Sequence, residues 1–152
     1  MTFKEKQTKG SICLLVSIIL ALIGFIIFVV NSTTGYLAGS QINLGTLILS
    51  IIAIVFGTIL FFFKDSTEKY DTLISIVIGL LLSVSVCLFI YSRISLAADV
   101  WFIPVNYPEA EETALMISIV GVAFYVLSII SLSLSAIFGI EAEHKTKVEV
   151  VE

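Results

Sequence analysis

The chain has 152 residues, of which 59% are apolar and only 13% are charged, and its formal net charge is −4. A soluble domain carries about 25% charged residues, so half that fraction leaves too little polar surface to cover a water-soluble particle. The length allows one domain, and the composition excludes an ordinary soluble protein.

The apolar residues are gathered in four long runs, and none of the runs contains Asp, Glu, Lys, Arg or His. About 20 helical residues cross the roughly 30 Å hydrocarbon core of a bilayer, where each backbone polar group must be paired within its own element. We therefore predict an all-α integral membrane protein, a bundle of four transmembrane helices. The spans are expected at about 12–30, 44–63, 73–91 and 113–138.

Charged segments flank this transmembrane domain of residues 12–139. Residues 1–11 hold three lysines ahead of an apolar run too long for a signal peptide, so we expect the first helix to be retained. Residues 140–152 form a charged tail that we expect to be mobile, and its lone His144 is expected to be solvated. The first link, residues 31–43, is uncharged and turn-prone, and the second, residues 64–72, is short and mixed in charge.

The lysines predict how the chain is threaded. With four spans, seven of the eight basic residues fall on one side of the membrane, and only Arg93 falls on the other. Basic residues in short loops favour the cytoplasmic side. We therefore expect both termini in the cytoplasm, in a plasma (inner) membrane whose Ile-rich, Lys-containing style suggests a bacterium.

Small residues recur four positions apart within each run, which is the spacing that lets membrane helices approach closely. Such ridges are expected to pack helices within one bundle or between copies, and the serines among them leave open a polar path for a solute. They are Ser17, Ala21, Ala53, Gly57, Ser75, Gly79, Ser83, Ser131, Ser135 and Gly139.

The stretch from Ser92 to Glu112 is the longest segment between apolar runs, and it holds the only Trp, the only Arg and both prolines. We expect the third helix to continue to about Ala98, with Arg93 at the outer headgroup level, where it can reach lipid phosphates. The following segment is apolar but interrupted by proline, and we predict that it lies at the outer interface. Pro108 suits the first position of the fourth helix, followed by acidic residues in its first turns.

This stretch is either a packed cap over the helix ends or a surface that binds another membrane protein. The candidate partner surface combines apolar and acidic side chains: Asp99, Val100, Trp101, Phe102, Ile103, Tyr107, Glu109, Glu111 and Glu112. Its carboxylates lack the spacing of a calcium-binding EF-hand.

Reactive groups are missing from the four runs. The sequence has no helical histidine pair, no Cys-x-x-Cys and no glycine-rich phosphate loop, and no ionisable residue lies in the expected hydrocarbon zone. We therefore expect no enzymatic activity, no catalytic or metal site, no cofactor and no nucleic-acid binding.

Two classes of function remain. The leading hypothesis is a non-catalytic accessory or interaction subunit of a membrane complex, whose partners are the lipid bilayer and another membrane protein or a second copy of itself. The alternative is a small oligomeric channel or facilitator for a neutral or weakly polar solute, or a membrane immunity or holin-like protein.

Overall fold

The computed structural model describes residues 3–38, 42–62, 71–102 and 109–149, and side chains are placed within 9–38, 42–62, 72–102 and 109–138. This part of the chain is almost entirely helical and contains no strand. The elements are the α-helices α1 (Phe3–Thr33), α2 (Leu44–Phe62), α3 (Asp71–Tyr91), α4 (Ile94–Phe102) and α5 (Glu109–Glu149), with a 3-10 turn η1 (Gly35–Leu37).

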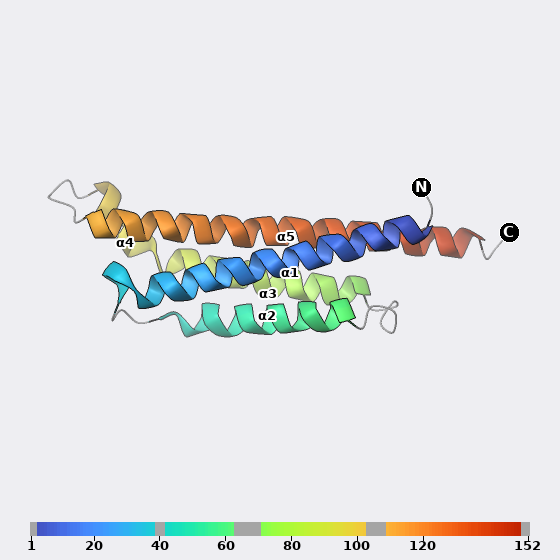
Figure 1. Cartoon of the computed structure of the whole chain (residues 1–152), viewed down its shortest axis with the longest axis horizontal. Coiled ribbons are helices and arrows are strands. Elements are labelled where there is room, and N and C mark those ends of the chain that lie inside the picture. The colour runs from blue at the N-terminus through green and yellow to red at the C-terminus, as the bar shows by residue number, and fades with distance from the viewer. Residues whose placement is uncertain (1–2, 39–41, 63–70, 103–108, 150–152) are drawn as a thin grey trace.

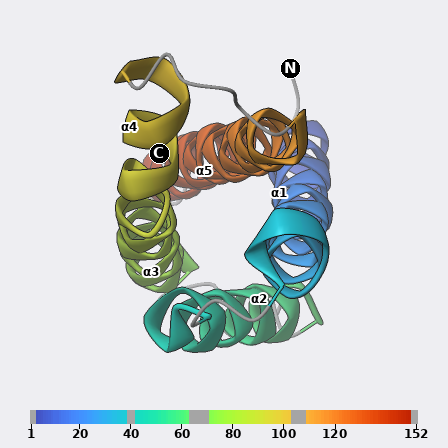
Figure 2. The same cartoon turned by 90° about the vertical axis from the view of Figure 1, so that its left-hand side faces the viewer.

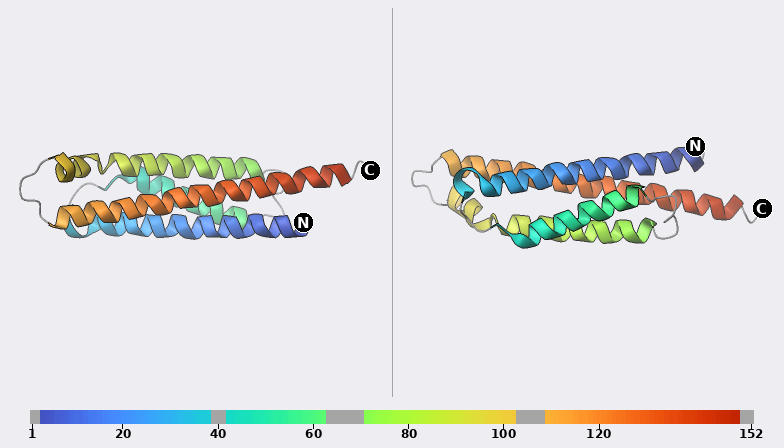
Figure 3. Two further views of the ribbon diagram at one scale, coloured as in Figure 1. Left: turned by 90° about the horizontal axis from the view of Figure 1, so that it is seen from above. Right: turned by 60° about the horizontal axis from the view of Figure 1, so that its bottom comes forward.

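Four of the helices lie lengthwise beside one another and form a bundle (Figure 1). Viewed from one end, they follow one another around it in the order α1, α2, α3 and α5, so that each helix packs against two neighbours (Figure 2). The most extensive contact is between α1 and α5, which run antiparallel. The start of α1 and the end of α5 lie at the same end of the bundle (Figure 3).

Each of these four helices is long and apolar enough to cross a membrane. The candidate spans are Lys9–Thr33, Leu44–Phe62, Thr72–Tyr91 and Glu109–Phe138. They match the four runs expected from the sequence, so the prediction of an all-helical chain with four long apolar helices is confirmed.

The bundle is apolar on its outside and partly polar within. Isoleucine, leucine and valine side chains are exposed along all four long helices, whereas serines, a threonine and an asparagine are buried between them. Such a surface would be unfavourable in water. Lipid tails are as apolar as these side chains, so in a bilayer the contacts between helices would rely on small residues and hydrogen bonds.

The prediction that the third helix continues to Ala98 is wrong. Helix α3 ends at Tyr91, because the Ser92 hydroxyl donates to the Phe89 carbonyl at 2.7 Å and the Arg93 N–H bonds to Ile90 O, three residues back, at 2.9 Å. These bonds tighten the last turn and end the α-helical ladder. The segment Ile94–Phe102 then forms α4, which lies across the end of the bundle instead of extending α3 (Figures 1 and 2).

Both charged ends of the chain continue the helices next to them. Helix α1 begins at Phe3 and α5 continues to Glu149, whereas from the sequence we expected a mobile tail over residues 140–152. The tail contains neither proline nor glycine after Gly139. Its sequence spaces Glu141 and Lys145, and also Glu143 and Lys147, four residues apart with the acid first, which favours a helix.

A candidate groove beside a buried arginine

The bundle has two distinct ends. The termini end holds the start of α1 and the end of α5, and the opposite end holds α4, η1 and the break between α3 and α4 (Figure 1). We name the second one the Arg93 end. It gathers most of the residues that the sequence singled out as a candidate partner surface.

Arg93 is buried in this end, with only 8% of its surface exposed. Its Nη2 donates to the hydroxyl of Ser32 at the end of α1, while its Nε has no hydrogen-bond partner. The guanidinium Cζ lies 6.0 Å from the ring centroid of Phe28 and 5.7 Å from that of Phe89. Two aromatic faces and one hydroxyl therefore surround the only arginine of the chain.

The placement differs from the expected one. We predicted that Arg93 would reach outward to lipid phosphates, but the turn at Ser92 directs it between α1 and α3, toward Ser32 and the two phenylalanines. Burial lowers the pKa of the Arg93 guanidinium from its ordinary value, because desolvation disfavours the charged form. An arginine nevertheless keeps its proton in proteins, so a cation remains buried here.

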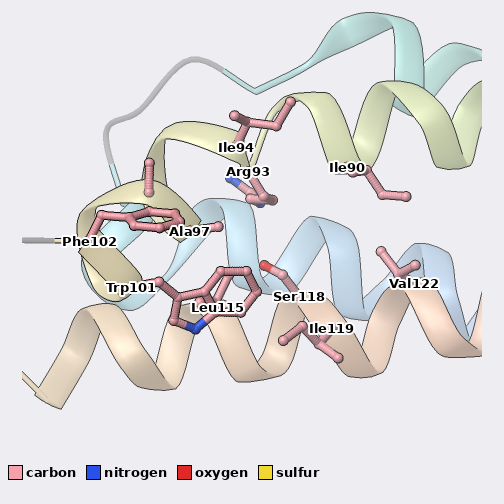
Figure 4. A pocket seen from close by; sticks show the side chains of 11 residues that line it. Ile90, Arg93, Ile94, Ala97, Trp101, Phe102, Leu115, Ser118, Ile119 and Val122 are labelled. Carbon is pink, nitrogen blue, oxygen red and sulfur yellow. The ribbon is translucent and has the colours of Figure 1, made fainter.

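A groove of about 430 Å³ opens beside Arg93, between the end of α3, α4 and the first turns of α5 (Figure 4). Apart from Arg93 and Ser118, its walls are apolar or aromatic. It is lined by Ile90, Arg93, Ile94, Ala97, Ala98, Trp101, Phe102, Leu115, Ser118, Ile119 and Val122.

Helix α4 is held on one side and open on the other. Leu96 is buried against Leu37, Ala114 and Leu115, and Val100 packs against the same cluster. The opposite face presents Trp101, 66% exposed, and Phe102, 79% exposed, at the rim of the groove. The helix therefore anchors itself with one face and displays two aromatic rings with the other.

The predicted acidic residues lie nearby. Asp99, Glu109 and Glu112 are exposed, and Glu111 is half-buried in the first turn of α5. The Tyr36 side chain of η1 forms a hydrogen bond with Glu111, and this bond, with the carboxylate's charge, raises the pKa of Tyr36. Within the described residues no three His, Cys, Asp or Glu side chains are grouped closely enough to hold a metal. Ile103 and Tyr107 lie outside the described residues.

The predicted packing residues can also be located. Ser17, Ala21, Ala53, Gly57, Ser75 and Ser135 are buried between helices, and Gly79 and Ser131 are half-buried. Ser83 is half-buried and donates to the carbonyl of Gly79 within its own helix, at 2.8 Å. For Gly139 only the helical backbone is described.

A ladder of serine hydrogen bonds joins α5 to α1. Ser17 and Ser128 each donate to the other's carbonyl, at 2.9 and 2.8 Å. Toward the termini end, Ser131 donates to the carbonyl of Cys13 at 2.8 Å and Ser135 to that of Gly10 at 2.7 Å. The ladder thus joins α1 to α5 in the half of the bundle that lies toward the termini end.

Two buried polar groups were missed by the sequence reasoning. Asn31, placed in a loop by the sequence, lies in the last turn of α1 and donates to the Ala114 carbonyl at 2.9 Å and to the Ser118 hydroxyl at 2.7 Å. A second group lies in the core, where the Ser50 hydroxyl is 2.6 Å from that of Ser85 and 2.7 Å from that of Tyr125. Polar residues inside apolar runs were the available signal, but their pairing across helices depends on a register that one sequence does not reveal.

No family model matches this sequence, and neither the curated proteins nor the solved structures include one with significant similarity to it.

Proposed function

We propose that this chain is a non-catalytic accessory or interaction subunit of a complex in a bacterial plasma membrane, with both termini in the cytoplasm. Four helices long and apolar enough to cross a bilayer support the location. The lysine distribution supports the threading, since seven of the eight basic residues come before the first expected span, between the second and third, or after the fourth. Under this proposal the Arg93 end faces away from the cytoplasm.

The observation that carries the proposal is the open face of α4. Trp101 and Phe102 are among the most exposed large side chains of the described residues, and the exposed residues Asp99, Glu109 and Glu112 lie at the same end of the bundle. Aromatic residues are enriched where membrane proteins meet an interface and where proteins bind partners. Two exposed aromatic side chains on α4, with acidic residues at the same end of the bundle, suit a partner that offers an apolar pocket and nearby basic residues.

The alternative function, a channel or facilitator, has less support from the core. Phe28, Phe89 and Tyr125 are fully buried where α1, α3 and α5 meet, and their rings stack edge to face at centroid distances of 4.9 and 6.3 Å. The hydroxyls of the α1–α5 serine ladder bond to backbone carbonyls of the facing helix. These groups hold the helices together, and among the described residues the Thr46 hydroxyl is the one buried hydroxyl without a hydrogen-bond partner.

Affinity purification from native membranes in mild detergent, after crosslinking, tests the proposal. We expect a stoichiometric membrane partner with the wild-type chain, and we expect Trp101→Ala combined with Phe102→Ala to lower its recovery at least tenfold without reducing the amount of the chain. Loss of two central aromatic contacts commonly costs 2 kcal/mol or more, roughly a thirtyfold loss of affinity.

A matched control is provided by α2. Phe56 and Phe62 are 47% and 75% exposed and lie toward the termini end, so replacing both with alanine removes similar apolar area elsewhere. This control is expected to retain the partner. Equal recovery with the α4 variant and with the wild type would contradict the proposal, as would selective solute flux through vesicles that contain the chain alone.

A further inference from the structure

We propose that the groove beside Arg93 binds one acyl chain of a membrane lipid, which it recognises by the hydrocarbon and not by the headgroup. The inference rests on the proposed location of the chain in a bilayer and is independent of the proposed protein partner. It assigns an occupant of stated chemistry to the space between α3, α4 and α5.

The lining of the groove selects an uncharged, apolar ligand. Arg93 is part of the wall, but its Nη2 donates to Ser32 on α1, so the guanidinium is turned away toward the inside of the bundle. The Ser118 hydroxyl is also engaged, because it donates to the Ala114 carbonyl at 2.9 Å and accepts from Asn31 at 2.7 Å. A polar ligand group would lose its hydration here without gaining a hydrogen bond, a cost that hydrocarbon does not have.

The size of the groove suits a single chain. Its volume of about 430 Å³ lies within the roughly 300–1,000 Å³ of sites that hold small molecules, whereas a second groove, between α2 and α3, has about 220 Å³. The walls are elongated, with Trp101 and Phe102 at one end and Ile90 and Val122 at the other (Figure 4). A partner helix about 10–12 Å across would use up this volume within about one turn, whereas a lipid tail can follow its length.

The position of the groove places it against lipid tails. Ile90 belongs to the candidate span Thr72–Tyr91, and Val122 belongs to the span Glu109–Phe138. In a bilayer, a groove between two spans opens onto hydrocarbon, and the aromatic residues of α4 lie at the end where the interface begins. A chain in the groove contacts three helices, whereas a chain on an exposed helix face contacts one, so dispersion contacts hold the first more firmly.

Such a chain would also complete the packing of α4. This helix is anchored through Leu96 and Val100, which pack with the cluster of Leu37, Ala114 and Leu115. Its other residues at the groove, among them Ala98 and Trp101, face the space that the chain would fill. The lipid tail therefore takes the place of a missing protein contact between α4 and the ends of α3 and α5.

Retention of lipid by the purified chain tests the inference. The full chain is extracted in a mild non-ionic detergent, stripped of loosely bound lipid, and mixed with phosphatidylcholine or phosphatidylglycerol that carry the same long acyl chains. Native mass spectrometry counts the lipids bound. We expect equal occupancy by these two lipids and roughly tenfold weaker binding of a short-chain phosphatidylcholine, because its tails make fewer contacts with the walls.

Two variants fill the groove from opposite walls. Ala98→Phe acts from α4, where Ala98 is half-buried and lies outside the cluster that anchors the helix. Ile119→Phe acts from α5, where the isoleucine is 46% exposed, so it tests the site even where Ala98→Phe fails to fold. Each is expected to lose one bound lipid per chain, with affinity reduced roughly tenfold or more.

Matched controls lie on α5 outside the groove. Ala123 is exposed, and Ile130, 52% exposed, lies three turns beyond Ile119 on the same helix face. Ala123→Phe and Ile130→Phe are expected to retain the lipid as the wild type does.

Equal lipid retention by the wild type and by Ile119→Phe would overturn the inference. A preference for one headgroup would also overturn it, since recognition would then depend on a charge that the groove does not present. So would a bound polypeptide, instead of a lipid, that is lost in the two groove variants. Each of these results leaves the partner proposal standing, because that proposal is measured by co-purification, whereas absence of the chain from the membrane fraction would overturn both.

Discussion

Buried serine hydroxyls form the hydrogen bonds that join α5 to α1. Lipid tails give no hydrophobic drive for one helix to join another, so in a bilayer helices would be held together by close packing and by hydrogen bonds between them. Ser17 and Ser128 form a closed pair in which each hydroxyl donates to the other helix's backbone, and both side chains are almost fully buried. Ser133, only five residues from Ser128, donates to Ile129 in its own helix and is exposed.

This contrast gives a prediction for single serines. Ser128→Ala is expected to lower the free energy of unfolding by roughly 0.6–1.7 kcal/mol, the usual range for hydrogen bonds between membrane helices. Ser133→Ala is expected to change it by less than about 0.5 kcal/mol, since only a bond within α5 is lost. Reversible unfolding of the purified chain in mixed detergent micelles measures both. Equal effects of the two variants would show that the serine ladder does not join the helices.

Single residues also mark the limit of what the sequence predicted. Runs without charge identified the four long helices. The spacing of small residues predicted helix packing at Ser17, Ala53 and Gly57, and these three residues are buried. The pairing of Ser50 with Tyr125 and the burial of Arg93 were not predicted. The pairing of Ser50 with Tyr125 depends on which helices face each other. The burial of Arg93 depends in addition on the turn at Ser92, where the chain changes direction.

At the scale of elements, the pair α1 and α5 is the closest contact in the bundle. Glycines make this approach possible: a Cβ added to Gly121 would lie 3.0 Å from Ile27 Cγ2 of α1 and 3.1 Å from Phe89 Cε1 of α3. A Cβ at Gly24 would lie 3.0 Å from the Tyr125 ring and 3.3 Å from the backbone oxygen of Gly121. The two glycines thus mark the crossing where α1, α3 and α5 are in contact.

Replacing one of these glycines therefore tests the helix pair. Gly121→Ala is expected to be less stable than Gly79→Ala by about 1–3 kcal/mol, the usual cost of overfilling a packed core. The control at Gly79 meets its nearest atom, Leu132 Cδ2, at an ordinary 3.7 Å, and alanine is the better helix former. The same unfolding titration compares the two variants. A Gly121→Ala chain as stable as the control would mean that α1 and α5 are less closely packed than described.

Element boundaries were harder to predict than element existence. The sequence placed four long helices correctly, but the third helix was expected to continue to about Ala98, and the residues after it were expected as a segment at the outer interface. The reason is local chemistry: a serine at position 92 bonds back to Phe89 and stops α3, although no proline or glycine lies there. Apolar periodicity alone does not signal such a stop.

For the whole molecule, the arrangement of the ends carries a prediction about threading. The start of α1 and the end of α5 lie together, and the Arg93 end lies at the far side of four helices long enough to span a bilayer (Figure 3). Basic residues favour the cytoplasmic side because translocating them is unfavourable. The lysine-rich termini end should therefore stay inside, while α4 and the acidic start of α5 cross.

Single cysteines report the side of each end in intact cells. The native Cys13 and Cys87 are free thiols and are first replaced with alanine. A membrane-impermeant maleimide added outside is expected to label Glu112→Cys, which is exposed at the Arg93 end, and to leave Thr8→Cys and Lys145→Cys unlabelled until the membrane is opened. Labelling of the two termini from opposite sides would contradict four spans. Labelling of both termini, with Glu112→Cys protected, would keep the bundle but reverse its orientation, and would show that the seven lysines do not determine it.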